Sequence, residues 1–124
     1  MNMYTDEVLR RFKDPKYMGK IENANGIGKV GNPQCGDLMH VYIRVEDDKI
    51  VDISFETFGC VSALAASDAL CELADGVSIE EAKKISDKDI ADKLGGLPPI
   101  KHHCSILGSQ ALKDAIADYE GKKN

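Results

Sequence analysis

Three cysteines of this 124-residue chain stand where predicted turns meet helices or strands. Cys35 lies in the turn Gly-Asn-Pro-Gln-Cys-Gly-Asp, Cys60 follows Phe-Gly, and Cys104 follows Lys-His-His. Cys60 and Cys104 each stand near the start of a predicted helix, where free N–H groups and the helix dipole favour the thiolate. The thiolate is the form that attacks an electrophile or binds a metal, so these cysteines define a candidate site.

An aspartate and two histidines extend the candidate site. Asp37 follows Cys35 by two positions, and at the start of a strand such positions point to the same side. His103 directly precedes Cys104, and His102 adds a second imidazole that could compete as a ligand. Three thiolates with one imidazole or carboxylate suit either tetrahedral zinc or a 2Fe–2S cluster. The spacing matches no zinc-finger or ferredoxin motif, so it leaves the metal and the fourth ligand open.

The composition indicates an ordinary globular protein. Hydrophobic residues make up 43% and charged residues 30%, which fits one domain over residues 1–124. A net charge of −5 argues against binding nucleic acid. Neither a membrane-spanning run nor a secretory signal is expected, so we predict a cytoplasmic protein without disulfides. The fourth cysteine, Cys71, stands between leucines in a predicted helix, and we interpret it as part of the core.

The periodicity predicts a helix, then strands, then helices alone. Alternating apolar residues predict two strands around a turn at 46–49, and the glycine-rich stretch before them holds a short first strand. Strands are expected at 28–31, 37–45 and 50–58, and helices at 4–13, from 62 to a stop at Gly76, from a capping box at Ser78, from 86 to about 95, and at about 103–119. The predicted fold class is α+β, with a small three-stranded antiparallel sheet and helices packed on one face.

Several motifs together resemble the IscU-type iron–sulfur cluster assembly scaffolds, a family that includes the N-terminal domain of NifU. The resemblance covers nearly the whole chain through the stretches DPKYMG, GNPQCGD, FGC-SA, LPPIKHHCS and ALKDAIADYE. Cys-Gly-Asp, Gly-Cys-x-Ser and Leu-Pro-Pro-x-Lys-x-His-Cys in this order form a highly specific combination.

The resemblance implies a scaffold and carrier rather than an enzyme. It implies that a transient 2Fe–2S cluster is assembled on Cys35, Cys60 and Cys104 and then passed to apoproteins. Asp37 and His103 are expected to contribute to the site, with Asp37 keeping the cluster labile. Cys104 is the expected acceptor of sulfur, and zinc can occupy the site when it holds no cluster.

The same resemblance implies protein partners. A pyridoxal-phosphate cysteine desulfurase of the IscS or NifS type supplies persulfide sulfur, a ferredoxin supplies electrons, and a frataxin-like protein assists. An Hsp70-type chaperone with its J-protein is expected to grip the segment Leu97, Pro98, Pro99, Ile100 and Lys101. Because prolines cannot continue a helix, we interpret this segment as a rigid handle whose displacement would loosen the cluster.

Three other functions compete with this interpretation. Zinc-dependent sulfur acceptors of the SufU type resemble the same family, but they carry an insertion between the second and third cysteines and lack the histidine at position 103. A cysteine-nucleophile enzyme, with Cys104 activated by His103, leaves Cys35, Asp37 and Cys60 unexplained. A pure protein-binding module would tolerate replacement of all three site cysteines.

Overall fold

The computed structural model describes residues 5–32, 37–59, 61–95 and 102–123, with the backbone alone at 32, 37, 102–105, 122 and 123. Cys35, Cys60 and the proposed chaperone segment 97–101 therefore lie outside the described residues. The elements are α1 (Asp6–Lys13), β1 (Gly26–Asn32), β2 (Asp37–Glu46), β3 (Lys49–Phe58), α2 (Val61–Ala74), α3 (Ile79–Ala82), α4 (Asp87–Lys93) and α5 (His102–Lys123).

The three strands form one antiparallel sheet in the order β1-β2-β3. A two-residue turn joins β2 to β3, and its residues Asp47 and Asp48 both adopt positive φ angles, of 52° and 60°. Two left-handed residues give the turn the twist that a tight hairpin needs, and aspartate tolerates this conformation better than most residues. The turn expected at 46–49 is thus confirmed.

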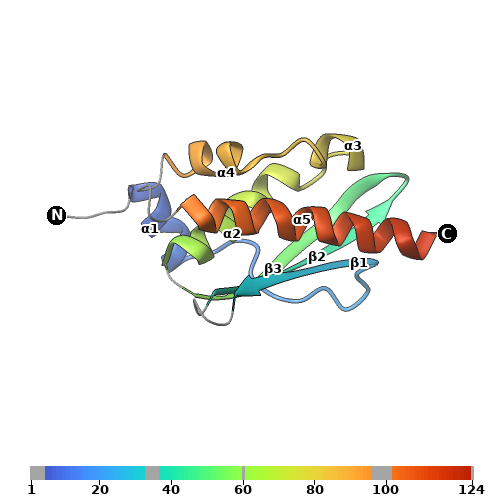
Figure 1. Ribbon diagram of the computed structural model, residues 1–124, viewed down its shortest axis with the longest axis horizontal. Coiled ribbons are helices and arrows are strands. Elements are labelled where there is room, and N and C mark those ends of the chain that lie inside the picture. Colours follow the sequence, from blue (N-terminus) through green and yellow to red (C-terminus); the bar gives the residue numbers. More distant parts are fainter. Residues whose placement is uncertain (1–4, 33–36, 60, 96–101, 124) are drawn as a thin grey trace.

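One face of the sheet is covered by α2 and α5, which pack against each other, as Figure 1 shows. The strand residues on this face are buried, among them Met39, Val41, Ile43 and Phe55. In a further layer, α4 packs on α5 and α2, and α1 packs on α2. The predicted α+β class, with helices on one face of a small antiparallel sheet, is confirmed.

Strand β1 extends over Gly26–Asn32 and is longer than the expected stretch 28–31. Its glycines, which are poor strand formers, allow the backbone of α5 to pack directly against the strand. A Cβ atom at Gly28 would lie 2.0 Å from the Ala111 carbonyl oxygen, and one at Gly26 would lie 2.5 Å from the Ala115 carbonyl oxygen. No side chain fits between these backbones, so the glycines set the distance between strand and helix.

The residues between α1 and β1 also form backbone hydrogen bonds with the sheet. Tyr17 and Gly19 pair with the free edge of β3 through Phe55, with Gly19 N donating to Phe55 O at 2.8 Å. The chain then crosses the uncovered face of the sheet to reach β1 at the opposite edge. Asn25 ends the crossing by bonding both backbone groups of Val45, at 2.8 and 2.9 Å.

A buried ion network fixes α1 to the helices behind it. Arg11 is only 2% exposed and lies 2.8 Å from Glu7, 2.8 Å from Asp68 and 3.1 Å from Glu72. Lys93, at the end of α4, lies 2.7 Å from the same Glu72 oxygen that Arg11 contacts. The hydrogen bond from Lys93, together with Arg11, holds the pKa of Glu72 below its ordinary value against the effect of burial.

The same network explains the turn that follows α1. The second oxygen of Asp68 accepts hydrogen bonds from the backbone N–H groups of Lys16 and Tyr17, at 2.8 and 3.0 Å. The motif DPKYMG is therefore held by a carboxylate of α2. Thr5, which caps α1 by accepting from Val8 N, also donates to the Leu94 carbonyl oxygen at the end of α4.

Two helices at the C-terminal side differ in detail from the expectation. Ser78 caps α3 by accepting from Glu81 N, but the reciprocal capping box is formed at α4, between Ser86 and Asp89. α5 extends from His102 to Lys123, beyond the expected end at Tyr119. No helix among the described residues combines the length and apolar character needed to cross a bilayer.

We predict that Gly28→Ala destabilises the protein by about 3 kcal/mol, because the added methyl group forces α5 away from β1. Gly121→Ala, in the same helix α5 but with no atom near its added Cβ, should stabilise the protein by up to about 1 kcal/mol. Urea unfolding of both variants measures the difference. Equal effects at the two positions would contradict the close approach of β1 and α5.

Candidate functional site

Each of the three strands has one end next to a predicted site residue in the sequence or close to it. These three strand ends lie together at one end of the sheet. Asn32 at the end of β1 pairs with Asp37 at the start of β2, and Leu38 pairs with Phe58 at the end of β3. Cys35 belongs to the segment between Asn32 and Asp37, and Cys60 follows Gly59 directly. We call this end of the molecule the site end.

α5 begins above the same end. A Cβ atom at Gly108 would lie 3.9 Å from the sulfur of Met39, which shows where α5 crosses β2. Counting back from this contact, Cys104 lies about 6 Å along the helix axis and Asp37 about 7 Å along the strand. Since Ala111 and Ala115 lie over Gly28 and Gly26, the helix runs antiparallel to β1 and parallel to β2. The backbones of Cys104 and Asp37 therefore approach the same end.

Two helices at the site end, α2 and α5, lack acidic residues in their first turns. α1, α3 and α4 carry acidic residues there, as is common at the positive end of a helix. The first turns of α2 and α5 carry none. Figure 1 shows that α2 and α5 both start at the site end. Two helix dipoles without acidic side chains thus favour negative charge in this region.

The predicted site residues are described to different extents. Asp37 is the first residue of β2, and His102, His103 and Cys104 form the first turn of α5, all by their backbone. Cys35 and Cys60 lie outside the described residues. Within the described part of the chain, no three histidine, cysteine, aspartate or glutamate side chains gather as a metal site would require. The ligand set stays a prediction.

Cys71 is separate from the site end and fully buried in the core. Burial, followed by the nearby charges of Asp68 and Asp75, raises the pKa of its thiol well above the ordinary value. A buried, protonated thiol is a poor nucleophile and a poor ligand. The interpretation of Cys71 as a core residue is confirmed.

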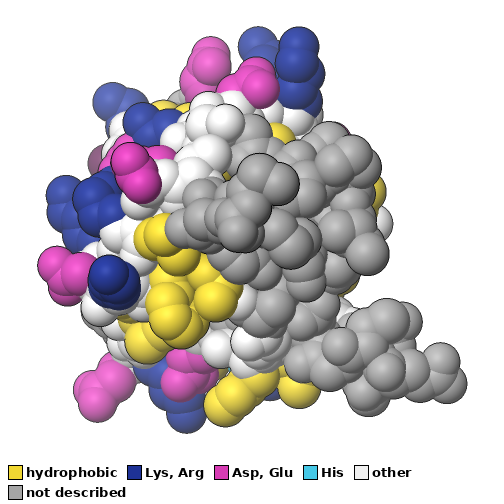
Figure 2. Space-filling model, turned by 90° about the vertical axis from the view of Figure 1, so that its left-hand side faces the viewer, with side chains coloured by type: hydrophobic (Ala, Val, Ile, Leu, Met, Phe, Trp, Pro, Cys, Tyr) yellow, Lys and Arg dark blue, Asp and Glu magenta, His cyan; other side chains and the backbone are white. Residues whose placement is uncertain are grey.

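The rim of the site end exposes apolar side chains. Phe58 is 69% exposed and its cross-strand neighbour Leu38 is 38% exposed. Figure 2 shows hydrophobic side chains gathered on this side of the molecule, next to the residues that are not described. On the same face of the sheet, Tyr42 donates to Glu56 at 2.6 Å, and burial together with this bond raises the pKa of Tyr42 to about 12.

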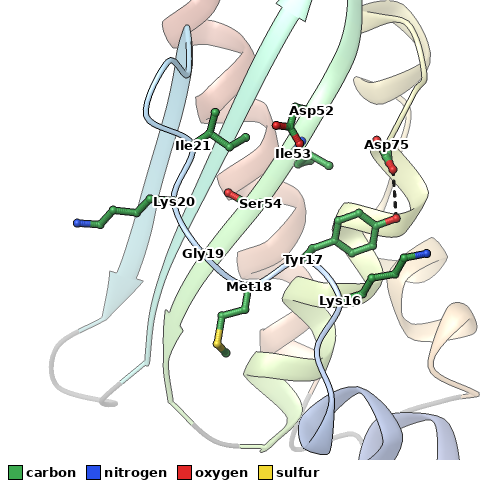
Figure 3. Close-up of a pocket in the computed structure, with 10 residues that line it drawn as sticks. All are labelled: Lys16, Tyr17, Met18, Gly19, Lys20, Ile21, Asp52, Ile53, Ser54 and Asp75. Atoms are coloured by element: carbon green, nitrogen blue, oxygen red, sulfur yellow. Dashed lines mark hydrogen bonds between the residues drawn. The ribbon is translucent and has the colours of Figure 1, made fainter.

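A cavity of about 350 Å³ lies elsewhere, between the crossing segment and β3. Figure 3 shows its lining residues on both sides, and shows the chain passing over the strands toward β1. Tyr17 donates to Asp75 at 3.2 Å beside it, and burial and then Asp75 raise the pKa of Tyr17 to about 12. None of the predicted site residues lines this cavity, so it is distinct from the site end.

Sequence reasoning missed two buried polar features of the structure. Arg11 and Asp68 were not singled out, because charged residues usually indicate an exposed surface. Ser62 entered only as a letter of the motif FGC-SA, yet it is fully buried in the first turn of α2. The motif was the single signal that pointed to it.

The chain resembles proteins of one family throughout its length. A family model described as the NifU-like N terminal domain matches residues 3–124. Two proteins of Archaeoglobus fulgidus, named iron-sulfur cluster assembly scaffold proteins IscU 1 and IscU 2, are each 54% identical over 94% of this chain and 76% of their own length. The Escherichia coli scaffold protein IscU is 44% identical over 97% of this chain and 96% of its own.

A solved structure agrees with this result. The crystal structure described as a putative iron-sulfur cluster assembly scaffold protein for the SUF system, from Fervidobacterium islandicum, matches with a TM-score of 0.76 and 26% identity. The match covers 92% of this chain and 96% of that one.

The fold and its site end define a class of small α+β proteins in which strand ends and two helix N-termini meet beside cysteine-bearing segments. The chain belongs to the family of NifU-like N-terminal domains. The family resemblance expected from the motifs is therefore confirmed.

We predict that Cys71 does not react in the native protein. A variant with serine at positions 35, 60 and 104 retains Cys71 as its single cysteine. A chromogenic disulfide reagent should detect no thiol in the native variant, and one thiol per chain after unfolding in guanidinium. Rapid reaction of the native variant would show that Cys71 is accessible.

Proposed function

We propose that this protein is a scaffold and carrier on which a transient 2Fe–2S cluster is assembled and then transferred to apoproteins. Cys35, Cys60 and Cys104 hold the cluster in this proposal. The observation that carries it is the meeting of the start of β2, the end of β3 and the first turn of α5 at one end of the sheet. Each of these ends adjoins one of the three cysteines in sequence.

The electrostatics of the site end support the proposal. A 2Fe–2S cluster with thiolate ligands is negatively charged, and the N-termini of α2 and α5 favour such a charge because no acidic residue neutralises their first turns. The high identity to proteins named as IscU scaffolds, over most of the chain, supports the same function. The protein is a carrier of cluster rather than an enzyme.

The chemistry of each remaining site residue suggests a separate role in the proposed site. Asp37 offers a hard carboxylate, which is a weak partner for iron that is bound by soft thiolates, so it favours departure of the cluster. His103 supplies an imidazole beside Cys104, and His102 offers a second one. Cys104 accepts sulfur from a cysteine desulfurase. Zinc, which also takes thiolate and imidazole ligands, occupies the site when the cluster is absent.

The partners follow from this function. A desulfurase delivers persulfide sulfur, a ferredoxin supplies electrons and a frataxin-like protein assists, in a cytoplasmic setting. The exposed side chains of Leu38 and Phe58 give such partners an apolar surface beside the site end. An Hsp70-type chaperone with its J-protein acts on residues 97–101, which lead from the end of α4 to the first turn of α5.

Anaerobic reconstitution tests the function. The wild-type protein, incubated with iron, cysteine and a desulfurase, should develop the visible absorption and the Mössbauer spectrum of a 2Fe–2S cluster. Serine at position 35, 60 or 104 should abolish or severely reduce cluster formation, whereas the control Cys71→Ala should retain it. Normal cluster formation by the variant with all three serines would refute the proposal.

We predict that Asp37→Ala yields a longer-lived cluster. Loss of the carboxylate removes the ligand that departs most easily, so decay in air and transfer to an apo-ferredoxin should both slow several-fold. Asp52→Ala is the matched control, because Asp52 is an exposed acid of β3 on the uncovered face of the sheet. Decay as fast as in wild type would contradict the role of Asp37.

A further inference from the structure

The two edges of the sheet differ in how far the rest of the described chain covers them. On the edge formed by β3, the backbone of Phe55 pairs with residues 17–19 and that of Ile50 pairs with residues 76–77. β1 forms the opposite edge (Figure 1), and no backbone group of the described chain pairs with it from outside. An edge strand without such a cover is a template for a further strand.

The backbone groups that face outward from β1 belong to Ile27, Lys29 and Gly31. Ile27 N donates to Asp118 Oδ2 of α5 at 2.9 Å, so it points away from β2. Backbone groups alternate in direction along a paired strand, so those of Lys29 and Gly31 point outward as well. Both residues are exposed, and their N–H groups have no partner among the described residues. We call the outward groups of residues 27–31 the open edge.

Opposite charges flank the open edge on the two faces of the sheet. Lys29 points to the uncovered face, because its neighbour Gly28 faces α5. One turn of α5, about 5.4 Å, nearly matches two strand residues, about 6.8 Å. Asp114, one turn before Asp118 on the same side of the helix, therefore lies beside Lys29 as Asp118 lies beside Ile27. Lys29 and Asp114 are both exposed and form no ion pair within the described chain.

A second copy of this chain fits the open edge poorly. Antiparallel pairing of two β1 strands keeps both α5 helices on the same face, and each α5 lies directly on its own β1. Paired strands are about 4.8 Å apart, whereas packed helices need about 8–10 Å between their axes. The two helices would therefore collide. Pairing centred on Lys29 would also set two lysines opposite each other, which is unfavourable.

We propose that the open edge binds an extended segment of a partner protein in which an acidic and a basic residue are adjacent. Backbone pairing with Lys29 and Gly31 adds this segment to the sheet as a further strand. Neighbouring residues of an extended chain point to opposite faces, so the acidic residue meets Lys29 while the basic residue meets Asp114 beneath α5. The inference goes beyond the proposed function and uses none of its cluster ligands.

Amide hydrogen exchange of the free protein tests whether the edge is open. The N–H groups of Lys29 and Gly31 should exchange rapidly, and those of Gly28 and Val30, which face β2, should exchange slowly. Light scattering of the same sample gives the oligomeric state. Protected Lys29 and Gly31 amides, in a monomer or in a dimer, show that the edge is already covered and overturn the proposal.

The peptide Thr-Lys-Glu-Val-Thr, blocked at both ends, is the probe for the bound segment. It should shift the NMR signals of the Lys29 and Gly31 amides saturably and slow their hydrogen exchange. The same peptide with an N-methyl group on its glutamate keeps the charges but loses an N–H that faces β1, so it should bind several-fold more weakly. Absence of a shift with the first peptide, or equal binding of the two peptides, overturns the proposal.

Lys29→Glu tests the charge pairing. The variant should bind the first peptide several-fold more weakly than wild type, and should prefer the peptide Thr-Lys-Lys-Val-Thr. Lys88→Glu is the matched control, because it makes the same change in net charge at an exposed lysine of α4, away from β1. Equal weakening by the two variants indicates unspecific attraction and overturns the proposal.

Discussion

The direct contact of α5 with the backbone of β1 is the constraint on which the site end depends. Gly26 and Gly28 leave no room for a Cβ atom, so carbonyl groups of α5 lie against the strand itself. This contact fixes both the height and the direction of the helix above the sheet. Because the first turn of α5 carries His103 and Cys104, the same contact determines where they stand relative to Asp37. Two glycines of β1, which contact the middle of α5, thus position residues at the beginning of that helix.

A second constraint holds the outer elements against this core. Arg11 and Asp68 form an ion pair that excludes water almost entirely, and Glu72 joins the pair to Lys93. Such a pair costs much desolvation, so its net contribution to the free energy of unfolding is small. The pair instead fixes geometry, because Arg11 of α1 contacts both Asp68 and Glu72 of α2 at once. Thr5 extends the arrangement to the Leu94 carbonyl, which ties α1 to the last turn of α4.

The sequence predicted those parts of the fold that have a periodic side-chain signal. β2 and β3 alternate apolar and polar residues, and α5 carries Leu112, Ala115 and Ile116 at helical spacing on its buried face. β1 was predicted too short, because Gly26 and Gly28 are poor strand formers selected for contact with a helix that is distant in sequence. The pairing of residues 17–19 with β3 uses backbone groups, which leave no pattern in the side chains.

The same reasoning separates the parts of the candidate site. Cys104 and Asp37 are recognisable in the sequence by the chemistry of their side chains and by their positions at the ends of predicted elements. Ser62 is not recognisable in this way, because it differs from the other buried serines in lacking a hydrogen-bond partner among the described residues of the folded chain, and that is a property of packing. Features of this kind become visible only once burial and hydrogen bonding are known.

The charge preference of the site end affects the stability of the empty and the loaded protein differently. Two helix ends without acidic residues in their first turns are less favourable in the empty protein than beside a negatively charged cargo. Cargo that satisfies them stabilises the folded state by linkage. The same gain opposes release, since every favourable contact must be given up on transfer. A carrier therefore benefits from one weak contact among strong ones, and in the proposed ligand set the carboxylate among thiolates is such a contact. In the proposed function, the two helix ends and Asp37 therefore act in opposite directions on the lifetime of a single cluster, and their balance sets how readily it departs.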